Sequence, residues 1–412
     1  MREIGGQTPR VRSPGWCQGL ALLTLACATL SMAQSAEGSQ HIASHAADPA
    51  AQTNWPQVFF DNARTSFNPS EKILSRSTVH RLKQEWAFNA GGYVSGLAVV
   101  QGIAYTGSGD GHVYAIDVST GKLLWRVLLD KSFDASWPTV VEGRVYVCTG
   151  VDQGLFYALN AKTGAVIWKF RPGGGVFNSP VVLEGRVYFG ANDGDVYALD
   201  VGTGKLVWKF PTGNLSSLLN PAVADGHVYI TAGTPSGDTL YALKASDGTF
   251  AWSFSATNDN GLGTAIVGDG KVFLGETDFP SGGFIYAFDA VTGKNIWTIN
   301  LGNGAAGWFA FANGVLYTDS SDGTDNLLAL DPATGRKLWG SLNFVALPVV
   351  ANGVIYGFPK SGQLAALDAR NGKLLKTVST LGNITGIAVV DGNVYSAGYI
   401  DTDLLIKYGV GK

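Results

Sequence analysis

A short sequence unit recurs along the chain, and this repeat limits the possible folds more than any other feature. One copy reads Val-Tyr-Phe-Gly-Ala-Asn-Asp-Gly-Asp-Val-Tyr-Ala-Leu-Asp over residues 187–200, followed by Val-Gly-Thr-Gly-Lys-Leu-Val-Trp over 201–208. The closing tryptophan recurs at seven positions and a lysine holds the eighth: Trp86, Trp125, Trp168, Trp208, Trp252, Trp297, Trp339 and Lys376. These positions span seven steps of about 41 residues each. The chain is therefore built from repeated structural units.

Each unit is predicted to form four short strands, A to D. In the third unit these are residues 180–183, 186–190, 195–200 and 205–210. Apolar and polar residues alternate in the last two segments, which is the pattern of half-buried strands. Glu184-Gly185 is expected to form the A–B turn. Asp200 and Gly204 suit the C–D turn, because Asp accepts local backbone hydrogen bonds and Gly adopts positive φ. The tryptophan on D is expected to fill the space between neighbouring units.

Eight A-B-C modules can be counted, and the ends of the chain complete them. The modules begin near Gly96, Trp137, Ser179, Asn220, Thr264, Trp308, Leu347 and Gly386. The last module lacks a D strand, whereas residues 82–88 have the pattern of a D strand with no module before it. Pairing these two segments closes a ring without an open sheet edge. The sequence therefore predicts an all-β fold, an eight-bladed β-propeller of four-stranded blades.

Composition narrows the class of partner. Charged residues make up 15% of the chain, hydrophobic residues 46%, and the formal net charge is −3. This balance argues against a disordered chain, and the lack of excess Lys and Arg argues against nucleic acid as a partner. The 55 glycines suit many tight turns. No segment after the N-terminal region is long and apolar enough to be transmembrane.

The N-terminal region has the features of an export signal. Three arginines precede an apolar stretch over residues 19–30, and Ser-Met-Ala at 31–33 supplies small residues for cleavage, so residues 1–33 are predicted to be a signal peptide. Residues 34–52 are predicted to be a flexible linker, which leaves 53–412 as the propeller. Lipidation at Cys27 is the less favoured alternative, because Leu25 lies two residues before it instead of three. The expected location is periplasmic or extracellular.

The repeat resembles a known family. The pattern D-x-x-T-G-K-x-x-W, with V-Y-x-G and Y-A-L-D before it, is similar to the PQQ-like (pyrroloquinoline quinone) β-propeller repeat. The leading segment, from Trp55-Pro56 to Asn68-Pro69 and on to Leu82-Lys83, also resembles that family, so the resemblance covers residues 55–412. It implies a propeller fold. The family includes periplasmic quinone-dependent alcohol and sugar dehydrogenases, and also the non-enzymatic propeller lipoprotein of the outer-membrane β-barrel assembly machinery.

The dehydrogenase pattern implied by the resemblance is absent from the sequence. Those enzymes hold the quinone between a tryptophan and a ring made by two adjacent cysteines, with a calcium or lanthanide ion on Glu, Asn and Asp and an aspartate base. This chain has no adjacent cysteines and no C-x-x-C-H haem signature. Cys148 aligns with Gly190, where a small residue is expected. We therefore expect no cofactor, and PQQ with Ca²⁺ belongs to the alternative function.

Function is expected where the copies differ. The A–B and C–D turns are short and alike, whereas the B–C and D–A loops vary and form the opposite face, which we call the loop face. The longest B–C loops (233–239, 276–283 and 319–326) carry a group of acids: Glu276, Asp278, Asp319, Asp322 and Asp325. Two interpretations are open. The acids form a solvated rim, or they form a cation site or a docking patch for a basic partner.

Two tryptophans share one register just before strand A. Trp137 lies in blade 2 and Trp308 in blade 6, so eightfold geometry places them on opposite sides of the axis. We expect these indoles to narrow the mouth of the channel, where a planar ligand or a peptide side chain could stack. The alternative is a hydrophobic plug, because a closed ring must fill its axis.

The functional prediction is a secreted, non-catalytic propeller. It would act as a monomeric binding or scaffold module for a protein, peptide or cell-envelope partner at the loop face. The alternative is a PQQ-dependent alcohol or sugar dehydrogenase with a reduced active site.

Overall fold

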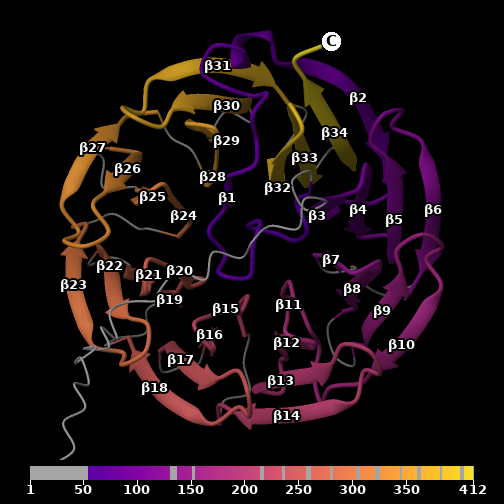
Figure 1. Cartoon of the computed structure of the whole chain (residues 1–412), viewed down its shortest axis with the longest axis vertical. Helices are drawn as coiled ribbons and strands as arrows, with labels where there is room; N and C mark the ends of the chain where they lie inside the picture. The colour runs from indigo at the N-terminus through magenta and orange to yellow at the C-terminus, as the bar shows by residue number, and fades with distance from the viewer. Residues whose placement is uncertain are drawn as a thin grey trace, which may run out of the picture. The chain divides into compact units, whose positions relative to one another are not determined.

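The computed structural model of the chain describes residues 54–129, 137–150, 154–213, 218–233, 237–256, 261–278, 282–302, 307–320, 325–343, 346–359, 363–380, 383–399 and 403–411. All of them belong to one compact unit, Ala47–Lys412. The predicted signal peptide and linker lie outside the described residues. Within the unit, eight small sheets stand around a central axis (Figure 1). The predicted all-β, eight-bladed propeller is confirmed.

The first four blades each contain four antiparallel strands, ordered from the axis outward as they follow one another in the chain. Blades 1 and 2 consist of β3 (Val94–Val100), β4 (Ile103–Ser108), β5 (His112–Asp117), β6 (Leu123–Leu128), β7 (Thr139–Val141), β8 (Arg144–Cys148), β9 (Phe156–Asn160) and β10 (Val166–Phe170). Blades 3 and 4 consist of β11 (Val181–Leu183), β12 (Arg186–Gly190), β13 (Asp195–Asp200), β14 (Leu206–Pro211), β15 (Ala222–Ala224), β16 (His227–Ala232), β17 (Thr239–Lys244) and β18 (Phe250–Ser255).

Two of the remaining blades gain a short extra strand. Blade 5 contains β19 (Gly261–Leu262), β20 (Ile266–Gly268), β21 (Lys271–Asp278), β22 (Gly282–Asp289) and β23 (Asn295–Asn300), with β19 and β20 both paired to β21. Blade 6 contains β24 (Phe309–Ala312), β25 (Val315–Asp319), β26 (Leu327–Leu330) and β27 (Lys337–Ser341). Blade 7 contains β28 (Ala346–Ala351), β29 (Val354–Phe358), β30 (Gln363–Asp368) and β31 (Leu374–Ser379), with β1 (Phe67–Asn68) parallel to β28.

The last blade joins the two ends of the repeat region. It consists of β32 (Asn383–Val390), β33 (Asn393–Tyr399), β34 (Leu404–Gly409) and β2 (Lys83–Asn89). Strand β2 pairs antiparallel with β34, and Lys83 lies opposite Gly409. The predicted closure by residues 82–88 is confirmed. Among the described residues the only helix is the short 3₁₀ turn η2 (Val79–Arg81), and none has the length and apolar character needed to cross a bilayer.

The third blade shows how the repeated residues form the turns. Glu184 and Gly185 have φ of 50° and 74°, the conformation of a tight hairpin turn. At the C–D turn, Asp200 Oδ1 accepts hydrogen bonds from Thr203 N at 2.8 Å and Thr203 Oγ1 at 2.6 Å. Gly204 has a φ of 69°. Both turns therefore form as the sequence predicts.

Each D-strand tryptophan packs against a glycine of the next blade. A Cβ atom placed on Gly204 would lie 2.6 Å from the Trp168 ring, and one on Gly248 would lie 2.6 Å from the Trp208 ring. The same contact pairs the other tryptophans with Gly121, Gly164, Gly293, Gly335 and Gly372. For six of these tryptophans the indole nitrogen also donates to a carbonyl of that next blade, as Trp168 does to Val201 O at 3.1 Å. Burying one indole contributes about 5 kcal/mol of transfer free energy.

The interface between blades 7 and 8 lacks this tryptophan and is filled differently. Lys376 holds the repeat position there. Residues that lead into β2 supply apolar side chains instead, and Leu74, Val79 and Leu82 are almost fully buried in the core shared with these blades. The carboxylate of Glu71 fixes the segment by accepting hydrogen bonds from the backbone of Ile73, Leu74 and Gly392. The leading segment thus completes the eighth interface.

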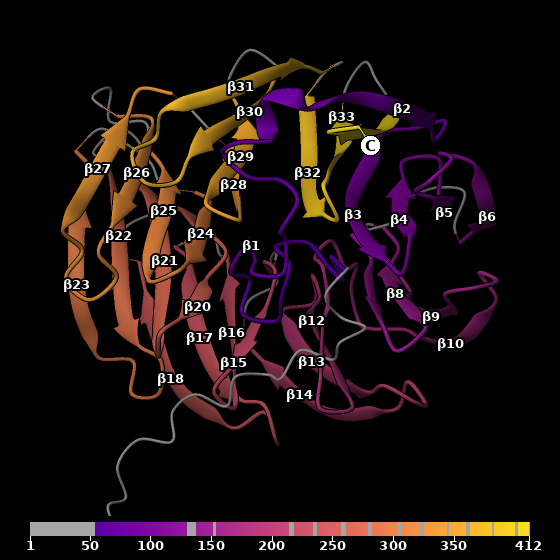
Figure 2. The same cartoon turned by 45° about the horizontal axis from the view of Figure 1, so that its top comes forward.

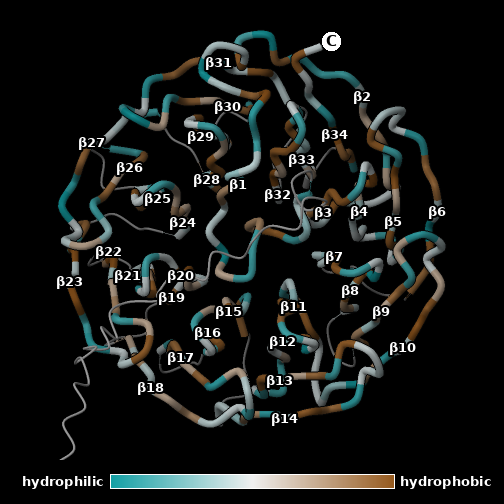
Figure 3. Tube along the Cα trace, in the orientation of Figure 1, coloured by the Kyte–Doolittle hydropathy of each residue, from teal (hydrophilic) through white to brown (hydrophobic). Residues whose placement is uncertain are grey.

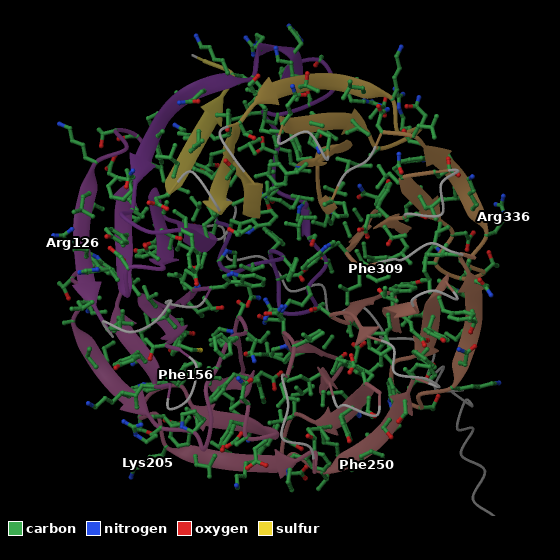
Figure 4. All side chains as sticks on the ribbon, turned by 180° about the vertical axis from the view of Figure 1, so that it is seen from behind. Arg126, Phe156, Lys205, Phe250, Phe309 and Arg336 are labelled. Atoms are coloured by element: carbon green, nitrogen blue, oxygen red, sulfur yellow. The ribbon has the colours of Figure 1, made fainter. Side chains whose placement is uncertain are left out.

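Apolar side chains also reach the outer surface. Figure 3 shows hydrophobic stretches on inner strands such as β32 and on outer strands such as β6. The side chain of Phe250 on β18 is 52% exposed, and Figure 4 labels it on the outer rim, whereas Phe309 lies near the axis. The outer strands shift register just before the tryptophan, as between Leu123 and Trp125 opposite β5. Such bulges interrupt the exposed edge, which protects it from pairing with another chain.

Two glycines of blade 3 allow a matched test of the inter-blade contact. Both have positive φ, but nothing lies within 4 Å of a Cβ atom placed on Gly185. Gly185→Ala should lower the free energy of unfolding by about 1 kcal/mol through backbone strain alone. Gly204→Ala should lower it by roughly 2 kcal/mol more, because its methyl group overlaps Trp168. Urea denaturation followed by fluorescence measures both losses, and equal losses would contradict the packing role.

Candidate functional site on the ring axis

The centre of the ring is occupied by the chain itself. Residues 54–68, which we call the hub segment, run along the inner strands (Figure 2). In six blades, one inner-strand residue donates its backbone N–H to a carbonyl of the hub segment at 2.7–2.8 Å. This residue lies three positions before the glycine of the A–B turn. The six donors are Val99, Val140, Val223, Val267, Phe311 and Val350. In blade 8, Asn68 Nδ2 donates to Val389 O at 2.8 Å. The segment therefore ties the blades together on the axis.

A fully buried arginine links the hub segment to blades 3 and 4. Arg64 Nη2 donates to Ser179 O at 2.5 Å, and Nε donates to Pro221 O at 2.8 Å. Nη1 donates within the segment, to Val58 O at 2.8 Å. Burial lowers the pKa of Arg64 to about 9, which leaves the guanidinium charged at neutral pH, and the nearby Asp61 opposes this shift. Three carbonyls that would otherwise lack a donor are thus satisfied by one side chain.

Several hub residues hold strained backbone conformations. Phe59, Phe60, Arg64 and Ser66 have φ between 53° and 74°, the left-handed region that L-residues other than Asn and Asp rarely adopt. On the blade side, Leu347 has a φ of 53°. It lies where β28 shifts register between Ala346 and Val349. Such strain persists only where the surroundings impose it, and it concentrates at functional sites.

The two predicted channel tryptophans both face the hub segment. The ring of Phe59 lies 6.3 Å from that of Trp137 and 5.9 Å from that of Trp308, measured between centroids. Phe59 also stacks under the Arg64 guanidinium, 5.9 Å from its ring. The indoles therefore contact an aromatic side chain of the same chain, as a hydrophobic plug requires. Sequence reasoning missed Phe59, Arg64 and Leu347.

A hollow remains beside Trp308. It is small, with a volume of about 20 Å³, which is room for about one water molecule. We call it the axial hollow, and it is lined by Val58, Phe59, Ser66, Trp308, Phe309, Leu347, Pro348, Val349, Thr385, Gly386 and Ile387. A smaller pocket on the other side of Trp308 is lined by Phe59, Thr264, Ile266, Gly307, Trp308 and Phe309. These linings are almost entirely apolar and contain no charged side chain.

One of the predicted acids positions Trp308. The Oδ1 atom of Asp319 accepts hydrogen bonds from Gly307 N at 3.1 Å and from Trp308 N at 2.9 Å. Burial raises the pKa of Asp319 to about 6, and the two backbone donors oppose this shift. Asp319 thus fixes the backbone that carries the indole.

Two of the other predicted acids have partners elsewhere in their own blades. Glu276 is 1% exposed, and its Oε2 atom accepts a hydrogen bond from the Tyr286 hydroxyl. Asp325 forms an ion pair with Lys337. The side chain of Asp278 and all of Asp322 lie outside the described residues. Within the part of the chain that the structure describes, no three His, Cys, Asp or Glu side chains are placed to hold a metal ion.

Cys148 and the aligned small residue Gly190 occupy equivalent positions at the ends of β8 and β12. The Cys148 side chain is fully buried in the cluster between blades 2 and 3, with Sγ 3.9 Å from Asn178 O. A Cβ atom on Gly190 would lie 2.4 Å from Leu218 Cβ. The position therefore demands a small side chain, as the sequence predicts.

Comparison with known proteins places the repeat in a family. The family model described as outer membrane protein assembly factor BamB, built on the PQQ-like repeat, matches residues 65–153, 149–219 and 237–399. The chain belongs to this family. No curated protein sequence matches it significantly.

Solved structures of several kinds share the fold. BamB from Moraxella catarrhalis is 18% identical, with a TM-score of 0.62 over 80% of this chain and 99% of that one. Quinohemoprotein alcohol dehydrogenase ADHIIG from Pseudomonas putida HK5 is 17% identical, with a TM-score of 0.68 over 87% and 80%. A europium-containing methanol dehydrogenase is 16% identical, with a TM-score of 0.65 over 84% and 89%. At these identities the similarity extends to the fold.

The described axial residues do not fit a quinone with its metal ion. A PQQ molecule carries carboxylates that need cationic or polar partners, whereas the axial hollow is lined by apolar groups. Arg64, the cation of the hub segment, already donates to three carbonyls. Phe59 of the chain contacts both Trp137 and Trp308.

The role of Asp319 predicts a specific pH dependence of stability. Its pKa is about 6 in the folded chain against 3.8 ordinarily, so the folded state binds the proton more tightly than the unfolded state. The stabilisation from protonation is therefore present at low pH and is lost as pH rises from about 4 to about 6. Between pH 4 and pH 6, the free energy of unfolding of the unchanged protein should therefore fall by about 2 kcal/mol relative to that of the Asp319→Asn variant. Urea denaturation of both proteins at four pH values measures their free energies of unfolding. A difference between the two proteins that stays constant with pH would contradict the prediction.

Proposed function

We propose that the chain is exported and acts as a monomeric, non-catalytic propeller, a rigid scaffold that binds a protein, a peptide or a cell-envelope component at its loop face. The contact of Phe59 with Trp137 and Trp308 carries this proposal. It fills the position where a planar cofactor would stack, and it leaves an apolar hollow beside Trp308. The family match to an outer membrane assembly factor supports a scaffold role.

Photo-crosslinking from the two faces tests the binding role. Leu342 follows β27 next to the B–C loop of blade 6 and is 72% exposed, whereas Val291 in the C–D turn of blade 5 is 56% exposed. A photoreactive phenylalanine analogue at position 342 should crosslink a discrete partner from the cell envelope, and the same analogue at position 291 should not. The Val291 variant is a matched control, because both positions are exposed aliphatic residues on adjacent blades. Equal crosslinking from both faces, or none from position 342, would overturn the proposal.

The second candidate function is a PQQ-dependent alcohol or sugar dehydrogenase with a reduced active site. The fold shared with the quinohemoprotein and methanol dehydrogenases favours it. The mature chain should be titrated with PQQ and Ca²⁺, and then assayed for dye-linked oxidation of alcohols and sugars. We expect no saturable quinone spectrum and no turnover, because the axial hollow offers the quinone carboxylates no charged partner. Saturable binding with turnover would reverse the choice between the two functions.

A further inference from the structure

A strip of exposed basic residues crosses one face of the ring at blades 7 and 8. This face is formed by the A–B and C–D turns, lies opposite the loop face, and is called the turn face below. Residues 69–83, which we call the basic strip, connect the hub segment to β2. The exposed basic residues of the strip are Lys72, Arg76, His80, Arg81 and Lys83. The strip precedes the repeats, so the other blades have no counterpart of it.

Hydrogen bonds hold the strip against the turns of both blades. Asn352 Nδ2, in the A–B turn of blade 7, donates to Leu74 O at 2.9 Å. Gly392 N, in the A–B turn of blade 8, donates to Glu71 Oε2 at 3.1 Å. Farther along the strip, η2 lies beside the outer strand β31, as Figures 1 and 2 show. The strip therefore runs in a fixed position from the inner turns to the outer edge of the turn face.

This region is positively charged, although the chain as a whole has a formal net charge of −3. The strip and the neighbouring residues 368–376 contain seven Lys and Arg: Lys72, Arg76, Arg81, Lys83, Arg370, Lys373 and Lys376. Three acids lie among or beside them: Glu71, Asp368 and Asp391. The corresponding turns of blade 3 are balanced, with Glu184 and Asp200 against Arg186 and Lys205. The excess of positive charge thus comes with the strip.

Several of these cations have no carboxylate partner. Arg76 and Arg370 both contact Asp368, at 3.8 Å and 2.7 Å between nitrogen and oxygen. Among the residues that the structure describes, four of the cations form no ion pair: Lys72, Arg81, Lys83 and Lys373. Their charge is therefore available to attract an anionic partner.

The side chains around the cations favour a lipid bilayer over an acidic protein as this partner. Protein interfaces are enriched in aromatic residues and depleted in lysine. Residues 69–83 and 368–376 contain no Phe, Tyr or Trp, and four of their seven cations are lysines. Ile73, directly after Lys72, is 51% exposed, and Leu374, directly after Lys373, is 42% exposed. Cations beside exposed aliphatic side chains are typical of segments that lie on anionic membranes.

We infer that the turn face of blades 7 and 8 docks on an anionic lipid bilayer through the basic strip. The cations lie over the anionic headgroups, and Ile73 and Leu374 enter the interface. The loop face then points away from the bilayer, toward the partner of the proposed function. The inference goes beyond that function and uses the opposite face, so either one can fail while the other holds.

Vesicle flotation tests the inference on residues 34–412, the chain without its predicted signal peptide. The two vesicle types are pure phosphatidylcholine and phosphatidylcholine mixed with phosphatidylglycerol. The partition coefficient should be at least about tenfold higher for the anionic vesicles, and it should fall as salt rises, because ions screen the attraction. Equal partitioning onto both vesicle types, or no flotation with the anionic vesicles, would overturn the inference.

An acidic peptide tests the other class of partner. A dye-labelled peptide of alternating Glu and Leu is titrated with the same chain, and its binding is followed by fluorescence anisotropy. We expect the anionic vesicles to bind the chain and to displace any bound peptide, because a bilayer offers many more charges to the strip. Binding of the peptide without flotation of the chain would assign the strip to an acidic protein and overturn the inference.

A charge-reversal variant locates the docking surface. Arg81→Glu combined with Lys83→Glu should lower the partition coefficient onto the anionic vesicles at least about tenfold. Lys162→Glu combined with Lys205→Glu makes the same change in net charge at exposed positions of blades 2 and 3, and Figure 4 labels Lys205 on the outer rim there. This control should bind within about twofold of the unchanged chain, because charges far from the contact are screened.

The result of the comparison depends on where the bilayer contacts the ring. Equal weakening by the two variants would show attraction by net charge alone, and unchanged binding of the strip variant would place the contact elsewhere. Either result would overturn the inference. Urea denaturation should give both variants the midpoint of the unchanged chain, because all four substituted side chains are exposed. If the Glu variant of the strip unfolds, Arg81→Gln combined with Lys83→Gln takes its place and should weaken binding in the same direction.

Discussion

The ring depends on one contact that is repeated between blades, that of a D-strand indole with a turn glycine of the next blade. At Trp168 and Gly204 there is no room for even a methyl group between ring and backbone. The indole nitrogen then donates to Val201 O of the same turn. Each blade is thus bound to its neighbour by residues that also shape its own turn. Because the interfaces repeat, the hydrophobic stabilisation is spread around the ring.

Residues ahead of the repeats compensate where the tryptophan is missing. The interface of blades 7 and 8 has Lys376 at the tryptophan position, and the leading residues fill it with Leu74 and Val79. Just before these residues in the chain, the hub segment lies on the axis, where Arg64 donates to carbonyls of blades 3 and 4. The chain itself thus occupies the axis beside Trp137 and Trp308 through Phe59.

The candidate site was only partly predictable from the sequence. Register alone identified Trp137 and Trp308 as axial residues, because eightfold geometry relates positions in different blades. It did not reveal Phe59, which lies in a segment without a repeat, so no alignment of copies could place it. The acids were grouped by loop length, yet Glu276 bonds to Tyr286 and Asp319 to the backbone of Trp308. Such hydrogen-bond partners depend on the direction in which each side chain points, and this direction is determined by packing in the folded chain.

The sequence by itself determined the number of blades, the strand order, the turn residues and the closure of the ring. These features follow from local rules. Alternation indicates a strand, and Asp and Gly indicate a turn. A D strand without a module at the start and a module without a D strand at the end are both completed by pairing with each other. Only the tertiary structure decided what occupies the axis. The path of residues 54–68 depends on hydrogen bonds to strands that lie far away in the chain, such as Val99 and Val350. Such contacts leave no periodic signal, because each is made once.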